Sequence, residues 1–155
     1  MYIQRHLQTA FLEANAFFPA LLVTGARQVG KTTFLRANAE PERGFVSLDP
    51  MDTRLQAQSD PRLFLANHPP PVIIDEIQYA PELLSYIKQI IDDLRYREPE
   101  RAHGLFWLTG SQQFGVMKGV SESLAGRIAI FNLHGLSAAE IAGRDNSAFL
   151  PTLDF

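Results

Sequence analysis

The residues from Gly25 to Thr32 have the types and the spacing of a loop that holds phosphate groups. The segment matches the pattern G-x-x-x-x-G-K-[ST] at every fixed position, and it runs Gly25, Ala26, Arg27, Gln28, Val29, Gly30, Lys31 and Thr32. In such a loop backbone N–H groups point at phosphate oxygens, the lysine reaches the β- and γ-phosphates, and the hydroxyl binds Mg²⁺. The pattern predicts a site for a nucleoside triphosphate with Mg²⁺. The alternative is a glycine-rich turn with a surface lysine.

A pair of carboxylates, Asp75 and Glu76, follows the apolar run at 72–74. An aspartate at the end of a buried strand can hold Mg²⁺, often through a water molecule. The adjacent glutamate would then take a proton from an attacking water as a general base. The alternative is that both side chains end a strand and face solvent. Beside a phosphate loop, the pair favours hydrolysis by water activated on Glu76.

Polar side chains also follow the apolar run at 105–108, at Thr109, Ser111 and Gln112. In the usual order of such sheets, this strand lies between the phosphate-loop strand and the Asp75 strand. One of the three side chains could then hydrogen-bond the γ-phosphate or orient the attacking water. The alternative is a turn made of ordinary turn-forming residues.

Arg127 precedes the apolar run at 128–131. An arginine can stabilise the charge that develops during phosphoryl transfer, either from within the chain or across a subunit interface. From its chemistry alone, Arg127 is equally well an ordinary surface arginine.

Short apolar runs alternate with segments of helical periodicity along the chain. The predicted strands are 20–24, 45–48, 72–74, 105–108 and 128–131. The predicted helices are 2–17, 32–38, 50–58, 61–67, 81–94 and a last short one that starts in a capping box at 137 and ends at 143. Asp49 and Asp60, each followed by proline, are predicted helix caps.

This alternation predicts an α/β fold with a five-stranded, mainly parallel sheet and helices on both faces. Ligands of such sheets bind at the carboxyl ends of the strands. The chemistry should therefore lie just after Thr24, Ile74 and Leu108.

Composition narrows the function classes. The chain has 155 residues, of which 46% are hydrophobic and 20% charged, so it is expected to fold as one globular domain. It has no cysteine, which excludes disulfides and cysteine-based metal sites. The net charge of −3 argues against a broad nucleic-acid groove. The longest apolar run, at 17–23, is too short to span a bilayer and no signal peptide is recognisable, so we expect a cytoplasmic protein.

Together these segments resemble a group of prokaryotic AAA-type ATPases, over residues 2–142. The resemblance rests on 18–33, 72–84, 108–114, 121–127 and 136–141, and it implies the three-layer sandwich of P-loop NTPases. It also implies a role for each motif: Gly25–Thr32 as the Walker A loop with Thr33 beside it, Asp75 as the Walker B carboxylate for magnesium, Glu76 as the catalytic glutamate, and Thr109–Gln112 as the sensor-1 region. Arg127 lies in the Leu-Ala-Gly-Arg box, which implies an arginine-finger or second-sensor position.

Members of this group usually continue into a helical or winged-helix part and a C-terminal domain of unknown function. We therefore expect residues 1–142, with the N-terminal helix at 2–17, to form an ATP-binding core, and 143–155 to be the stub of a downstream region. The expected function is ATP binding and Mg²⁺-dependent ATP hydrolysis. The alternative is a nucleotide-dependent switch or scaffold with little hydrolysis. The expected partners are ATP and ADP, no membrane, and a second copy of the chain through the Arg127 region.

Overall fold

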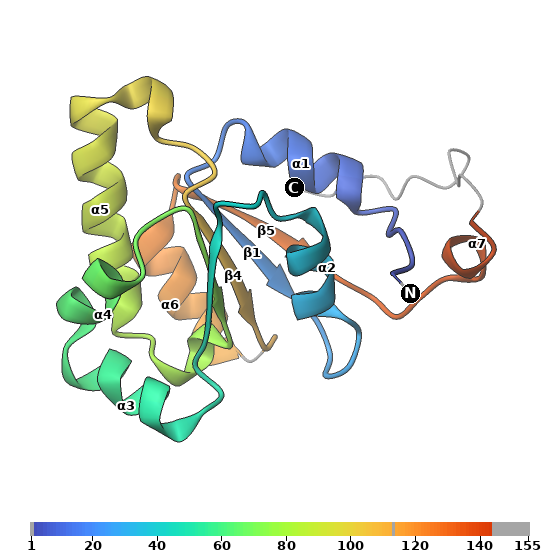
Figure 1. The fold of residues 1–155 in the computed structure, drawn as a ribbon, viewed down its shortest axis with the longest axis horizontal. Helices are drawn as coiled ribbons and strands as arrows, with labels where there is room; N and C mark the ends of the chain where they lie inside the picture. Colours follow the sequence, from blue (N-terminus) through green and yellow to red (C-terminus); the bar gives the residue numbers. More distant parts are fainter. Residues whose placement is uncertain (1, 113, 144–155) are drawn as a thin grey trace.

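Five strands form one sheet in the order β2-β3-β4-β1-β5 (Figure 1). In the computed structural model, which describes residues 2–112 and 114–143, every neighbouring pair of these strands is parallel. The strands are β1 (Ala20–Thr24), β2 (Gly44–Ser47), β3 (Val72–Asp75), β4 (Phe106–Gly110) and β5 (Ile128–Asn132). The predicted α/β fold is confirmed, and β4 lies between β1 and β3 as the motifs require.

Within the described residues, helices precede the first strand, connect the strands and follow the last strand. They are α1 (Gln8–Asn15), α2 (Lys31–Asn38), α3 (Met51–Ser59), α4 (Pro61–Asn67), α5 (Leu83–Arg97), α6 (Phe114–Leu124) and α7 (Ala138–Ile141), with 3-10 turns η1 (Ile77–Tyr79) and η2 (Pro99–Arg101). In the part of the chain that the structure describes, no helix has both the length and the apolar character needed to cross a membrane.

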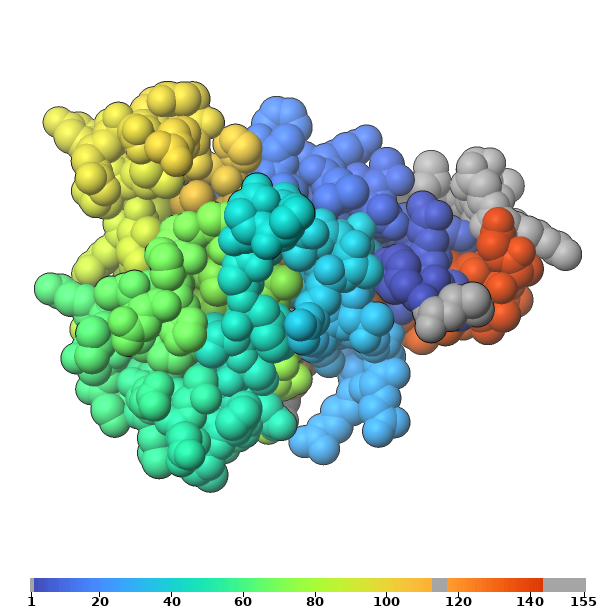
Figure 2. Space-filling model, viewed as in Figure 1, coloured from blue at the N-terminus to red at the C-terminus, as the bar shows by residue number. Residues whose placement is uncertain are grey.

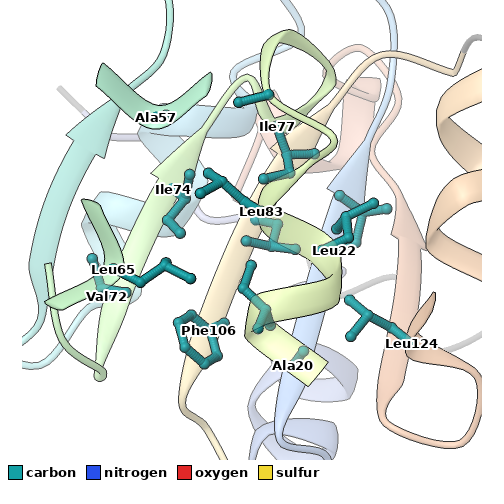
Figure 3. Close-up of a cluster of buried hydrophobic side chains, with 14 of the residues drawn as sticks. Ala20, Leu22, Ala57, Leu65, Val72, Ile74, Ile77, Leu83, Phe106 and Leu124 are labelled. Atoms are coloured by element: carbon teal, nitrogen blue, oxygen red, sulfur yellow. The ribbon is translucent and has the colours of Figure 1, made fainter. Parts of the chain in front are cut away.

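The sheet carries an apolar cluster on each face, because alternate side chains of a strand point to opposite sides. On one face, Leu22 and Ile74 pack with Leu83 of α5 (Figure 3). On the other face, Leu21 packs in a cluster with Phe11 of α1. Burial on both sides explains why β1, β3 and β4 are continuous apolar runs rather than alternating ones. The expected arrangement of helices on both faces is confirmed.

The N-terminal segment differs from the prediction. A helix over 2–17 was expected, but α1 begins at Gln8 and ends at Asn15. Residues 2–5 are not helical, and Arg5 is buried there with its guanidinium bonded to backbone carbonyls of distant segments. Those tertiary contacts replace the first turns that the apolar spacing predicted.

Two local signals also had different outcomes. Asp60 caps α4 as predicted, since its side chain accepts the Leu63 N–H at 3.0 Å. The predicted cap at Asp49 is wrong, because the residue before α3 is Pro50 and no side chain caps that helix. Helix α6 was not predicted from the sequence, and its two glycines weaken the helical signal there.

Replacing Phe11 with alanine should lower the free energy of unfolding by about 3–5 kcal/mol. Its ring is fully buried and meets the rings of Phe34, Trp107 and Phe131 edge-on, at centroid distances of 5.2, 4.9 and 5.6 Å. The matched control is Phe17→Ala, because Phe17 is 79% exposed, and it should change the stability by less than about 0.5 kcal/mol. Urea denaturation followed by tryptophan fluorescence measures both. Equal losses would contradict the anchoring of α1 through Phe11.

Candidate active site

The loop between β1 and α2 has backbone angles that its glycines make accessible. Gly25 has φ +155, and a Cβ there would lie 2.4 Å from the carbonyl oxygen of Leu133. Gly30 has φ +90 and directly precedes α2, which begins at Lys31. In Figure 2 this loop, in light blue, projects from the surface. The sequence motif therefore forms a turn that ends at a helix N-terminus, which is the arrangement that binds phosphate.

Lys31 folds back over this loop. Its ammonium group donates to the carbonyl oxygens of Gly25 at 2.8 Å and Ala26 at 3.0 Å, and the side chain is buried. The positive charge is thus held at the loop, where phosphate oxygens would lie. Ala26, Arg27 and Gln28 are exposed.

Asp75 at the end of β3 is the hub of the site. Its carboxylate is only 7% exposed, and three hydroxyl groups donate to it. The hydroxyls of Thr32 and Thr109 each lie 2.7 Å from Oδ1, and that of Ser47 lies 3.0 Å from Oδ2. The carboxylate thereby joins β3 to α2, β4 and β2.

The oxygens of Thr32 and Asp75 suit Mg²⁺, which prefers hard oxygen donors and retains waters and phosphate ligands. Within the described residues, no group of three or more His, Asp or Glu side chains could hold a metal by itself. The donor set therefore fits a magnesium ion that arrives with a phosphate, rather than one caged by protein alone.

Glu76 follows Asp75 in a left-handed backbone conformation, with φ 63 and ψ 50. Its N–H donates to Thr109 Oγ1 at 2.9 Å, which holds the turn in place. Its side chain is half-buried, and the Gln78 side-chain amide donates to Glu76 Oε2. Glu76 thus directly follows Asp75 in the chain, and its carboxylate has a hydrogen-bond partner other than those of Asp75 and Thr32.

The three candidates after β4 occupy different environments. The Thr109 hydroxyl is fully buried, and it is used in donating to Asp75 and accepting from Glu76. Ser111 Oγ is buried with no hydrogen-bond partner among the described residues, whereas Gln112 is exposed. Ser111 is thus the one of the three with a buried hydroxyl left to donate.

Arg127 lies at the other end of the sheet. Its carbonyl accepts the Ala20 N–H at 3.0 Å, at the amino end of β1, and the phosphate loop begins one strand length away, about 16 Å. Its guanidinium binds Asp92 through Nε at 2.7 Å and Nη2 at 3.0 Å. Because this position is remote from the loop, the structure contradicts an arginine finger acting within the chain. A role across a subunit interface stays a proposal.

Arg5 binds the backbone of the phosphate loop at Val29. The sequence did not indicate this contact. Arg5 Nη1 donates to the carbonyl of Val29 at 2.9 Å, and Nη2 donates to the carbonyl of His134. Its Nε lies 3.3 Å from Glu140 Oε2. The loop is therefore linked to the N-terminal segment and to α7, which lie side by side in Figure 1.

Glu140 pairs with Arg5, and it also completes the predicted capping box with Ser137. Burial would raise the pKa of the Glu140 carboxyl. The N–H donors of His6 and Ser137 and the positive charge of Arg5 outweigh that effect, so its pKa lies below the ordinary value of 4.5. The contacts of the buried Glu140 side chain therefore favour its ionised form.

Ser47, Gln78 and Arg5 are the contacting residues that sequence reasoning missed. Ser47 lies within a predicted strand beside the Asp75 strand, so sheet order could have indicated it. Gln78 follows the carboxylate pair by two residues, but no pattern places its side chain. Arg5 carries no local signal at all.

A family model described as "AAA domain" matches residues 18–142. Among curated proteins, an uncharacterized protein of Mycobacterium bovis and an uncharacterized protein of Mycobacterium tuberculosis are each 36% identical to this chain over 126 residues. Each match covers 79% of this chain and 26% of the relative. The chain thus spans about a quarter of the length of these relatives.

Replacing Thr109 with valine should lower the free energy of unfolding by about 1–3 kcal/mol, because the partly buried N–H of Glu76 and the buried Asp75 carboxylate each lose a partner. Thr109→Ser keeps the hydroxyl and should restore most of that loss. Chemical denaturation of the two variants measures the difference. A Thr109→Val variant as stable as the unsubstituted chain, or more stable than Thr109→Ser, would contradict a stabilising role of the hydroxyl, because valine lacks only the hydroxyl and serine lacks only the methyl.

Replacing Glu140 with glutamine should destabilise the protein by about 3 kcal/mol near neutral pH, because Arg5 loses a buried charge partner. A carboxyl with a lowered pKa in the folded state stabilises fully above its ordinary pKa of 4.5, and this stabilisation is lost as the pH falls through the folded value. The stability difference between the unsubstituted chain and the variant should therefore shrink below pH 4.5. Urea denaturation at several pH values tests this, and a difference that stays constant would contradict it.

Proposed function

Because this chain belongs to the AAA domain family, whose membership indicates a nucleotide-binding, ATPase-like function, we propose that it binds ATP with Mg²⁺ and hydrolyses the ATP. The observation that carries this proposal is the 2.7 Å contact between Thr32 Oγ1 and Asp75 Oδ1. It brings the hydroxyl of the phosphate loop and the carboxylate of β3 together as a pair of oxygen ligands for the metal.

In this proposal the loop from Gly25 to Thr33 wraps the phosphates, and Lys31 exchanges the carbonyls of Gly25 and Ala26 for phosphate oxygens. Thr32 and Asp75 hold the magnesium ion. When bound, Mg²⁺ supplies neutralisation of the negative charge on the β- and γ-phosphates. Ser111 donates its free hydroxyl to the γ-phosphate, with Gln112 as the neighbouring exposed candidate.

Glu76 is the proposed general base. Its carboxylate takes a proton from water as the water oxygen bonds to the γ-phosphorus. The bond from that phosphorus to the bridging oxygen of ADP breaks, and ADP and inorganic phosphate leave. Thr109 positions this base, because its hydroxyl holds both the Glu76 N–H and the Asp75 carboxylate.

A nucleotide-dependent switch or scaffold is the second candidate, and the position of Arg127 favours it. Since Arg127 is paired with Asp92 at the far end of the sheet, it does not neutralise phosphate charge in its own chain. Rapid turnover would then require an arginine from a second copy, supplied through the Arg127 region.

We also propose that residues 1–142 form the ATP-binding core of a longer cytoplasmic protein. Residues 144–155 of the proposed C-terminal stub lie outside the described residues.

Replacing Glu76 with glutamine should lower the rate of ATP hydrolysis at least about 100-fold while ATP still binds, because the variant loses the base and keeps the phosphate loop. The matched control is Glu82→Gln, an exposed carboxylate at the start of α5 whose side chain caps no helix. Phosphate release with Mg²⁺ and ATP, with Lys31→Ala as the blank, measures the rate.

The same assay over a range of protein concentrations separates the two candidates. Turnover per chain that rises with concentration supports an ATPase completed by a second copy. Turnover equal to the Lys31→Ala blank contradicts hydrolysis by this chain and favours the switch, which in turn requires a different oligomeric state or partner affinity with ATP than with ADP. Unreduced turnover in Glu76→Gln would place the base elsewhere.

A further inference from the structure

We infer that Gln78 is the positioning residue for Glu76, and that it couples the carboxylate to the loop after β4. The inference rests on the proposed function of this site and assigns a role to a residue that neither the motifs nor the family match identifies. Its basis is a side-chain amide that bridges the carboxylate of one loop and the backbone of another.

The backbone of Glu76 places the two side chains together. In a regular helix, residues two apart do not face each other. Here Glu76 adopts the left-handed conformation and the 3-10 turn η1 follows at once, with the Tyr79 N–H donating to the Glu76 carbonyl at 3.1 Å. This sharp turn brings the side chain of Gln78 close to that of Glu76, so that Gln78 Nε2 donates to Glu76 Oε2.

The other end of the same amide contacts the loop after β4. Gln78 Oε1 accepts the backbone N–H of Ser111, with 3.4 Å between oxygen and nitrogen. Gly110 lets η1 pack closely on the end of β4, since a Cβ there would lie only 3.3 Å from Ile77 Cγ2, while its 3.6 Å distance from Gln78 Oε1 would be an ordinary contact. The amide thus spans from the β3 loop to the β4 loop.

The hydrogen-bonding capacities of the partners fix the direction of the bridge. A backbone N–H can only donate, so it requires the oxygen of the amide. An ionised carboxylate can only accept, so it requires the nitrogen. Gln78 satisfies both partners at once and in one orientation, which glutamate or methionine at this position could not do.

The free hydroxyl of Ser111 gives the bridge its function. Ser111 Oγ is buried and has no hydrogen-bond partner among the described residues, while the N–H of the same residue is bonded to Gln78. A γ-phosphate that accepts from this hydroxyl would move or fix Ser111, and Gln78 would transmit that placement to Glu76. The base would be oriented when the third phosphate is present and less so with ADP.

Gln78→Met tests the positioning role, because methionine has similar length without an amide. We expect the kcat for ATP hydrolysis to fall about tenfold or more with KM changed by less than about twofold, since a misplaced base loses part of the contribution of general-base catalysis. The matched control is Gln58→Met, because Gln58 also bonds the same turn, through the Tyr79 carbonyl at 2.7 Å, without reaching Glu76. Full kcat in Gln78→Met, or an equal loss in both variants, would overturn the inference.

A double-variant comparison separates positioning from general support of the fold. If Gln78 acts through Glu76, Gln78→Met should add little to the loss caused by Glu76→Gln. The same factor of loss in both backgrounds would show that Gln78 acts independently of the base, and would overturn the inference.

An NMR measurement decides the point even where turnover is absent. The side-chain amide resonance of Gln78, identified by its disappearance in Gln78→Met, should shift in Glu76→Gln. It should also shift more with Mg²⁺ and a non-hydrolysable ATP analogue than with Mg²⁺ and ADP. A resonance that ignores Glu76→Gln, or responds equally to both nucleotides, would overturn the coupling. Absence of turnover above the Lys31→Ala blank contradicts the proposed hydrolysis alone.

Discussion

The buried carboxylate of Asp75 is the constraint on which the site depends. A carboxylate this far out of water is costly unless hydrogen bonds compensate the lost hydration. Three hydroxyl groups from three different elements supply them, at 2.7, 2.7 and 3.0 Å. The requirement to satisfy one charge therefore fixes α2, β2 and β4 around the end of β3. A cation that binds Asp75 directly would exchange with these contacts, and one carried by phosphates offers such an exchange without leaving the charge unpaired.

Two further sets of contacts hold the elements around the phosphate loop. Thr109 can serve Asp75 only through its single hydroxyl proton, which leaves the hydroxyl oxygen to accept the Glu76 N–H and thereby supports the left-handed turn. On the opposite side of the loop, Arg5 joins Val29 to Glu140. The phosphate loop is thus held by two charged groups: Asp75, which binds Thr32, and Arg5, which binds Val29 and Glu140. The second set of contacts includes α7, so the geometry at the loop is sensitive to the position of the segment that follows β5.

The sequence predicted the parts of this structure that depend on local pattern. The apolar runs predicted the five strands, and the fixed glycines predicted the turn that leads into α2, because turn geometry and strand burial restrict the residue types directly. Helix α6 was missed because its glycines mask the period, and the non-helical N-terminal segment was missed because Arg5 is held by contacts as far as 129 residues away. Gln78 was missed for a related reason: its role depends on the unusual φ of Glu76, which residue type alone does not reveal.

Arg127 shows the difference between a residue type and its position. The box that contains it predicts an arginine for phosphoryl transfer, yet sheet topology places it at the amino end of β5, away from the loop of its own chain. There Arg127 forms a two-contact ion pair with Asp92, whose pKa is lowered chiefly by that hydrogen bond. The side chains are 23% and 43% exposed, and pairs this accessible contribute about 1 kcal/mol or less. Giving up such a pair for a phosphate of a neighbouring copy would cost little, so the pairing does not prevent a role in trans. Distance alone excludes the role in cis, and completing the site with this arginine would require assembly.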